Sequence, residues 1–233
     1  EYMRVPLSRF TTRVFYNRTL LRQLTGLETA PSDWREFIEL CNIIRTKRNE
    51  RGEFYYPISS SAYHVGLWES GSINPVTWGL YRFADFNRDG NVGTDEMWAS
   101  FKAGILSFEM PELALRFRMF EELIQQFQPG FTGLTRDEAV MLFAKQRAVF
   151  IATGTWDAGS YLFQAESSGF ELGLMDYPTP SPDDPVYGSV ALGRRFDQAD
   201  QGFNFGVTRF SKHPPVAKDL LLFLARYRHK RRL

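Results

Sequence analysis

Apolar residues recur at helical spacing in three well-marked stretches of the chain. The first covers residues 34–44, where Asp33 is placed to cap a helix as part of a capping box. The second follows Pro111, because a proline at the first helical position loses no backbone hydrogen bond. Its predicted apolar face consists of Leu113, Phe117, Phe120, Ile124 and Phe127. Thr135 and Glu138 form a second capping box and predict the third helix.

Shorter apolar runs, rich in β-branched and aromatic residues, lie between these helices and predict strands. They occupy residues 13–16, 54–59, 148–152 and 204–210. Further helices are expected over residues 73–83, 96–106 and 214–227. The stretch 177–188 is rich in proline and aspartate and is typical of a loop. Strands that alternate with helices indicate an α/β protein whose sheet is largely covered.

Composition narrows the class of function. The 233 residues include 28 Lys and Arg and 27 Asp and Glu, so the net charge of +1 gives no reason to expect a nucleic-acid partner. The only cysteine, Cys41, rules out an intrachain disulfide, and its place on an apolar helix face predicts a buried thiol. Aromatic residues reach 15%, which indicates either an aromatic-rich core or exposed rings that stack on a ligand.

Four separated segments together resemble one known family. They are residues 4–27, 31–45, 137–162 and 204–227. The first carries a Val-Pro pair, an apolar strand, a Tyr-Asn pair and a short helix ending in Gly-Leu. The third carries a helix ending in a basic residue, a strand and a G-x-W turn at residues 154–156. In this order the segments resemble the extracellular solute-binding proteins of ABC importers, of the family 1 carbohydrate-binding type.

The resemblance implies an α/β fold, a periplasmic-binding-protein-like (type II) lobe with a mixed sheet flanked by helices. Three parts are then expected: residues 1–16 as crossing segment and strand from a first lobe, 17–203 as the second lobe, and 204–233 as a strand and helix returning to the first. The family has more chain on both sides, so we interpret this chain as a fragment lacking much of the first lobe. The implied protein is periplasmic or extracellular, with a lipid anchor at a missing N-terminus as one arrangement.

The same resemblance implies a receptor that carries a sugar or similar polar solute to a membrane permease. Sugars present C–H faces to aromatic rings and hydroxyls to planar polar groups. Trp156, on a turn between a strand and a helix, is expected either to stack on the solute or to pack in the core. The further candidate ligand-binding residues are Tyr63, Trp68, Trp78, Asp157 and Arg195. Core packing is the alternative for Trp78, and solvated salt bridges are the alternative for Asp157 and Arg195.

The stretch DFNRDGNVGTDE, residues 85–96, matches the spacing of an EF-hand calcium loop. Such loops place oxygen ligands at positions one, three, five, seven, nine and twelve and a glycine at six. Here the six ligand positions are Asp85, Asn87, Asp89, Asn91, Gly93 and Glu96. We expect a Ca2+ ion that acts as a structural staple, because no second loop of this kind is found to form a sensor pair. A polar turn that only imitates the motif is the alternative.

Two other classes of function compete with a receptor. A calcium-dependent interaction module would use the loop at 85–96 to order a surface for a protein partner. An enzyme is disfavoured, because the chain lacks G-x-S-x-G, G-x-x-x-x-G-K and H-E-x-x-H motifs and has only three histidines. A carbohydrate-active hydrolase needs two facing carboxylates, which spacing does not exclude, although Asp183 and Asp184 sit in the proline-rich loop and look solvated. His64 is expected to be a hydrogen-bonded loop histidine rather than a metal ligand.

Overall fold

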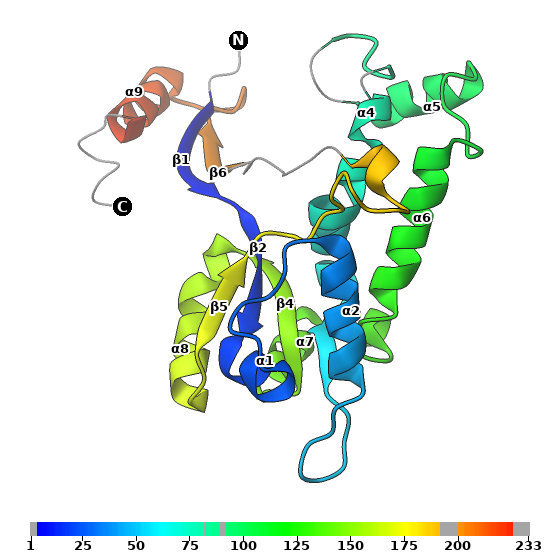
Figure 1. Cartoon of the computed structure of the whole chain (residues 1–233). Helices are drawn as coiled ribbons and strands as arrows, with labels where there is room; N and C mark the ends of the chain where they lie inside the picture. The colour runs from blue at the N-terminus through cyan, green and yellow to red at the C-terminus, as the bar shows by residue number, and fades with distance from the viewer. Residues whose placement is uncertain (1–3, 82, 89–91, 192–199, 226–233) are drawn as a thin grey trace. The chain divides into compact units, whose positions relative to one another are not determined.

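The structure is a computed structural model that describes residues 4–81, 83–88, 92–191 and 200–225 (Figure 1). The chain forms two compact units. Unit 1 comprises Glu1–Thr11, Gly154–Trp156 and Phe196–Leu233, and unit 2 comprises Thr12–Thr153 and Asp157–Arg195. The divisions fall before residues 12 and 196, whereas the sequence analysis placed them before residues 17 and 204. The assignment of each part to a lobe stays a prediction.

Unit 2 is built on a four-stranded sheet. Its strands are β2 (Thr12–Asn17), β3 (Tyr56–Ser59), β4 (Ala148–Gly154) and β5 (Leu172–Met175), in the order β3-β4-β2-β5. β3 runs parallel to β4, and β5 runs antiparallel to β2, so the expected mixed sheet is confirmed. Every residue of β4 is buried, as in a strand covered on both faces.

The helices of unit 2 include both of those predicted from capping boxes. They are α1 (Arg18–Thr25), α2 (Trp34–Arg45), α3 (Ala62–Trp68), α4 (Trp78–Tyr81), α5 (Thr94–Lys102), α6 (Pro111–Ile124), α7 (Arg136–Ala144) and α8 (Ala158–Ser168). Asp33 accepts two backbone N–H bonds at the start of α2, and Thr135 and Glu138 cap α7 reciprocally. The helix predicted over residues 73–83 is instead a 3-10 turn, Asn74–Thr77, followed by the single turn of α4.

Alternate side chains of the sheet serve two hydrophobic clusters. Phe150 packs against Phe37 of α2 on one face, whereas the next residue, Ile151, joins Phe143 of α7 and Tyr161 of α8. The larger cluster also contains Cys41, whose thiol is buried as predicted, and this burial raises its pKa well above the usual range. Helices therefore cover both faces of the sheet, as Figure 1 shows.

The buried face of α6 agrees in large part with the one predicted. Four of the five predicted residues are buried or pack partly buried against a hydrophobic cluster: Leu113, Phe120, Ile124 and Phe127. Phe117 is the exception, because its side chain is exposed. The helix also buries Met119 and Leu123, which the predicted face did not include.

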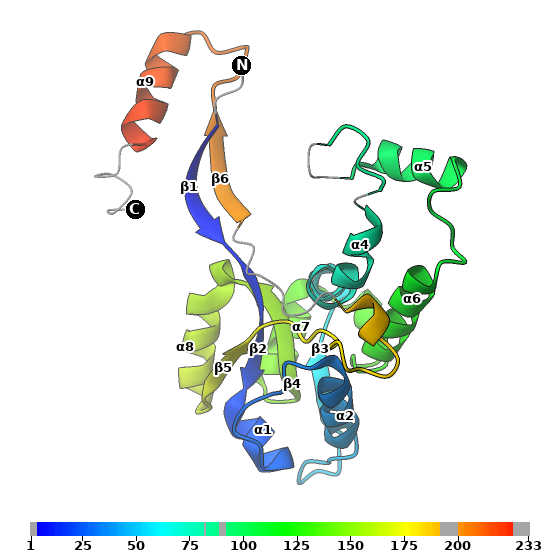
Figure 2. The ribbon, with the colours of Figure 1, turned by 45° about the horizontal axis from the view of Figure 1, so that its top comes forward.

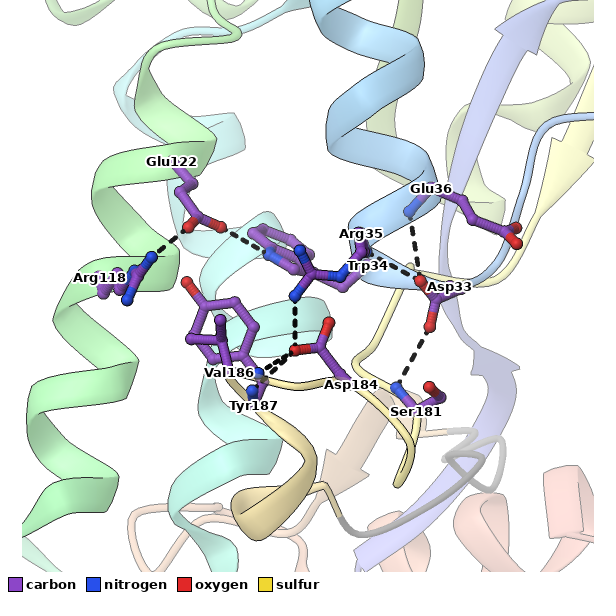
Figure 3. A network of polar contacts seen from close by, with 10 residues as sticks. All are labelled: Asp33, Trp34, Arg35, Glu36, Arg118, Glu122, Ser181, Asp184, Val186 and Tyr187. Carbon is purple, nitrogen blue, oxygen red and sulfur yellow. Dashed lines mark hydrogen bonds and ion pairs between the residues drawn. The ribbon is translucent and has the colours of Figure 1, made fainter.

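A polar network fastens the loop after β5 onto α2 (Figure 3). Asp33 accepts a bond from the Ser181 N–H at 3.2 Å in addition to capping α2. Asp184 accepts bonds from the N–H groups of Val186 and Tyr187, at 2.7 and 2.8 Å, and from the Arg35 guanidinium at 2.8 Å. The Asp184 side chain is almost wholly buried, which corrects the expectation that it is solvated.

The described residues of unit 1 form a two-stranded antiparallel sheet and one helix. Figure 2 shows β1 (Arg4–Phe10) beside β6 (Asp200–Gly206), which pair from Arg4 with Gly206 to Phe10 with Asp200. The strand β6 begins and ends four residues before the predicted run 204–210. Helix α9 (Pro214–Ala225) follows, within the stretch predicted as helical. Within the described part of the chain, no helix has the length and apolar character that crossing a membrane requires.

Candidate ligand-binding site

The candidate site lies where β3 and β4 end. These strands are parallel, so their carboxyl ends meet at one edge of the sheet. Ser60 and Ser61 follow β3 and lead into α3, while a 3-10 turn, Thr155–Asp157, follows β4 and leads into α8. Open α/β sheets bind ligands outside the carboxyl ends of their strands. Within unit 2, this edge therefore brings the residues that follow β3 close to Asp157, which lies about ninety positions further along the sequence.

Trp156 lies on the turn that follows β4, and the residue is 45% exposed. The ring packs edge-on against Phe10, with their centroids 5.0 Å apart. It also lies over Gly154, because a Cβ at that position would come within 2.1 Å of the indole. The glycine of the G-x-W turn thus leaves room for the ring. Of the two alternatives for Trp156, burial in the core is excluded by this exposure, and a role in stacking stays a prediction.

Asp157 forms the polar centre of the site. It accepts a hydrogen bond from the Thr153 hydroxyl and pairs with the Arg136 guanidinium. Only 20% of the Asp157 side chain is exposed, compared with 40% for Arg136. Arg136 is the first residue of α7, and the Thr135 cap fixes where that helix begins. The salt bridge expected for Asp157 is therefore present, but it is largely covered rather than solvated.

Tyr63, on α3, lies against the same arginine. The Arg136 guanidinium carbon is 5.0 Å from the centre of the Tyr63 ring, within the range of a cation–π contact. The ring of His64 meets Tyr63 at 84°, with centroids 5.2 Å apart. The Tyr63 side chain remains exposed, as a residue that contacts a ligand requires. Arg136 thus connects Tyr63, which follows β3, with Asp157.

His64 lies beneath this surface and is fully buried on α3, not in a loop. Its Nδ1 is 2.8 Å from the Ser61 hydroxyl, and its Nε2 has no hydrogen-bond partner among the described residues. Burial, reinforced by the nearby Arg136 charge and opposed by Asp157, lowers the pKa of His64 to about 4. The imidazole is therefore neutral at pH 7 and adds no charge to the site.

Comparison with known proteins identifies the family. The family model for bacterial extracellular solute-binding proteins matches residues 2–228. The chain belongs to this family. Family members bind solutes outside the cell, so the resemblance seen in the four sequence segments is confirmed, as is the α/β fold of this class. The family is one of binding proteins, not of enzymes.

Individual relatives of this member of the family are distant and longer. The multiple sugar-binding protein of Streptococcus mutans is 22% identical over 178 residues, which cover 75% of this chain and 38% of the relative. A chitin oligosaccharide binding protein matches with a TM-score of 0.63 at 16% identity, over 98% of this chain and 51% of its own. A sugar transporter from Bacillus licheniformis in complex with stachyose matches with a TM-score of 0.61 at 16% identity, over 98% of this chain and 53% of its own. The chain thus spans about half the length of these structures.

The other aromatic and basic candidates are not gathered at this edge. Trp68 is fully buried and packs between Phe37 and Tyr177, so the expectation that it contacts a ligand is wrong. Its place in α3 turns it toward the core, which the Gly- and Ser-rich surroundings did not indicate. Trp78 is half-buried at the start of α4, and its role in ligand binding stays a prediction. Arg195 lies outside the described residues.

Three functional candidates were missed by the sequence analysis. Arg136, Thr153 and Ser61 each contact a residue of the site. The Thr135 capping box was recognised, and it places residue 136 at the first position of a helix. What the sequence did not supply was the pairing of β3 with β4, which brings α3, α7 and Asp157 together within unit 2.

The loop at 85–96 is only partly described, because Asp89 and Asn91 lie outside the described residues. The Glu96 carboxylate turns back over the loop: one oxygen accepts the Phe86 and Asn87 N–H groups at 3.0 and 3.2 Å, and the other accepts the Gly93 N–H at 3.0 Å. Carboxylate and carbonyl oxygens are the donors that calcium prefers. The inward position of Glu96 suits the twelfth residue of a calcium loop, and its bonds to the amides equally suit a polar turn. No group of three or more His, Cys, Asp or Glu side chains placed for a metal occurs among the described residues.

Proposed function

We propose that this protein is a solute receptor of an ABC importer and that the edge formed by β3 and β4 holds part of a carbohydrate. The single observation that carries the proposal is the exposed Trp156 ring at the carboxyl end of β4, in a chain of the solute-binding family. Relatives described as sugar-binding proteins support a carbohydrate as the class of solute. Within unit 2, Tyr63 and the Arg136–Asp157 pair offer an exposed ring and hydrogen-bonding groups of their own.

The chemistry of the site suits a sugar. An indole face covers the C–H patches of a pyranose ring, and this contact needs an exposed ring held in one orientation. Phe10 and Gly154 provide that restraint for Trp156. Asp157 and Arg136 provide an acceptor and several donors for hydroxyl groups. Because Asp157 follows Trp156 directly, a stacking group and a hydrogen-bonding group occupy adjacent positions.

Replacing Trp156 tests the proposal. Stachyose, maltotetraose and a chitin tetrasaccharide would be titrated calorimetrically into the purified chain and into Trp156→Ala and Trp156→Phe variants. We expect at least one saccharide to bind, with affinity about tenfold weaker in Trp156→Ala, because an aromatic contact contributes about 1.4 kcal/mol. Trp156→Phe keeps a ring and should lose less.

Trp98→Ala is the matched control, because Trp98 is 70% exposed on α5 and is not part of the site. Its saccharide affinity should equal that of the unchanged chain. Equal affinities for Trp156→Ala and the unchanged chain would contradict the proposal. Recovery of the saccharide after incubation separates a receptor, which releases it intact, from a hydrolase, which shortens it.

The finer features of a receptor belong to the same proposal. We propose that the protein acts outside the cell or in the periplasm, that a lipid anchor retains it there, and that it delivers the solute to a membrane permease. The family description, which is extracellular, supports the location. We also propose that the loop at 85–96 binds calcium as a staple. If calcium binds and no saccharide does, the chain is a calcium-dependent interaction module instead.

A further inference from the structure

The Arg136 guanidinium has the chemistry of an anion-binding group. Arginine presents a planar fork of N–H donors that fits a carboxylate, and it stays charged at all physiological pH values. In this protein the group lies over the Tyr63 ring, and two-fifths of the side chain is open to solvent. A receptor for an acidic sugar, such as a uronate, would need a cation in this kind of position.

An internal carboxylate already holds that fork. Asp157 pairs with Arg136 and also accepts the Thr153 hydroxyl, so both partners that face it are donors. The hydrogen bond to Asp157 raises the pKa of Arg136 more than burial lowers it, so the cation persists and its charge is balanced by the carboxylate. The buried His64 beside them is neutral. The charges of Arg136 and Asp157 therefore balance each other, and His64 adds none.

We infer that the Arg136–Asp157 pair determines whether the site accepts a neutral or an acidic saccharide. The Asp157 carboxylate occupies the place on Arg136 where the carboxylate of a uronate would bind, so the site favours uncharged saccharides. This inference rests on the proposed function and deepens it. An incoming carboxylate would meet the like charge of Asp157, and it would have to displace Asp157 from a covered ion pair. A hydroxyl group meets neither obstacle, because it accepts from Arg136 or donates to Asp157 without a change in charge.

Asp157→Asn isolates this effect. The substitution keeps the size of the side chain and an acceptor for Thr153, but it removes the negative charge and leaves Arg136 uncompensated. Stachyose serves as the neutral tetrasaccharide and tetragalacturonate as the acidic one. The measured quantity is the ratio of their dissociation constants in 20 mM salt. We expect the ratio in Asp157→Asn to move toward tetragalacturonate by at least tenfold.

Two companion variants keep the test decisive. Arg136→Gln should move the ratio the opposite way, because it leaves the Asp157 carboxylate without its partner. The double variant Arg136→Gln, Asp157→Asn should lose the gain for tetragalacturonate, since no cation remains. In 0.5 M salt the gain of the single Asp157→Asn variant should shrink, as expected for a partly exposed charge.

The outcomes separate the inference from the proposal beneath it. A merely structural role for Asp157 would weaken both saccharides alike and leave the ratio unchanged, and that result overturns the inference. If circular dichroism shows that one single variant is unfolded, the other variant still tests the inference. The ratio of dissociation constants must then change in the direction predicted for that variant, and any other result refutes the inference. If the unchanged chain binds a saccharide of the earlier panel but neither variant alters the ratio, only this inference fails. If the unchanged chain binds no saccharide of any kind, both fail.

Discussion

His64 shows how a single buried imidazole makes stability depend on pH. In the folded state the pKa of His64 is about 4, mainly because of burial and secondarily because of the Arg136 charge. A histidine in an unfolded chain has a pKa of about 6.5. Between these values the unfolded chain holds a proton that the folded chain does not. The stability associated with neutral His64 is therefore complete above about pH 6.5 and is lost as the pH falls toward about 4.

Replacing His64 with Asn tests this account. The amide approximates one side of the ring and does not titrate, so the stability difference between the unchanged chain and His64→Asn should fall by roughly 3 kcal/mol between pH 7 and pH 4, at about 1.4 kcal/mol per pH unit. Urea unfolding at intervals of half a pH unit measures the difference. His213→Asn is the control, since His213 is exposed, and it should reproduce the unchanged profile. Parallel profiles for the unchanged chain and His64→Asn would refute the account.

Among the elements of unit 2, the loop after β5 is fastened by a buried carboxylate. Burial raises the pKa of Asp184, but the bonds from the Tyr187 N–H, Arg35 and the Val186 N–H outweigh it, so the net pKa lies below the usual range. A carboxylate with a lowered pKa stabilises the fold above its unfolded pKa, about 3.9, and this contribution is lost as the pH falls through the folded value. Near neutral pH the contribution is complete.

Asp184→Asn should therefore lower the free energy of unfolding at pH 7 by about 2–4 kcal/mol, because a buried charged acceptor is lost while its donors remain. Asp183→Asn is the matched control, since the Asp183 side chain is adjacent in sequence but exposed. This variant should change the free energy of unfolding by less than about 0.5 kcal/mol. Urea unfolding at pH 7 gives both values. Equal stabilities for the two variants would show that the network does not fasten the loop.

Elements whose signals are local were predictable from the sequence, and those that depend on distant partners were not. α2 and α7 begin where Asp33 and Thr135 can cap them, and both caps are formed. β5 is only four residues long, includes a glycine and pairs with β2, some 150 positions away, so nothing nearby identified it. The loop after β5 looked solvated for the same reason, because the Arg35 partner of Asp184 lies on α2.

The candidate site divides in the same way. Trp156 and Asp157 were identified because the G-x-W turn places them directly after a strand. Their surroundings needed the whole fold: Arg136 reaches Asp157 and Tyr63 only because β3 and β4 are parallel neighbours. Trp68 failed as a candidate because a helix points successive side chains in different directions, and composition does not reveal which of them faces the core.

At the scale of the whole molecule, the two units differ in how well they bury apolar side chains. Unit 2 encloses its sheet between two hydrophobic clusters. Among its described residues, unit 1 has two strands and one helix, which are too few to enclose a core. Within α9 only Leu221 is buried, and the exposed apolar residues are Val216, Leu220, Leu222 and Phe223. Stability that is measured on this chain is therefore chiefly that of unit 2.

Calcium tests whether the loop at 85–96 contributes to that stability. An ion that binds only the folded state stabilises it by about 2.7 kcal/mol at a hundred times its dissociation constant, which corresponds to a rise of roughly 5–10 °C in Tm. We expect such a rise in millimolar calcium, measured by calorimetry against an EDTA sample. Glu96→Gln should abolish it, because the twelfth position supplies the bidentate ligand.

A structural staple and a polar turn make different predictions for the same variants. If the loop is a polar turn, Glu96→Gln lowers Tm equally with and without calcium, since the loss is that of the bonds to Phe86, Asn87 and Gly93. If it is a staple, Glu96→Gln lowers Tm more in calcium than in EDTA, because the variant also loses the stabilisation by the ion. Glu109→Gln changes an exposed glutamate further along the chain and should keep the rise in Tm that calcium causes. A staple also leaves saccharide affinity unchanged by calcium, whereas a sensor would couple the two. An unchanged Tm at 10 mM calcium would contradict the calcium proposal, and the bonds that Glu96 accepts would then close the loop without an ion.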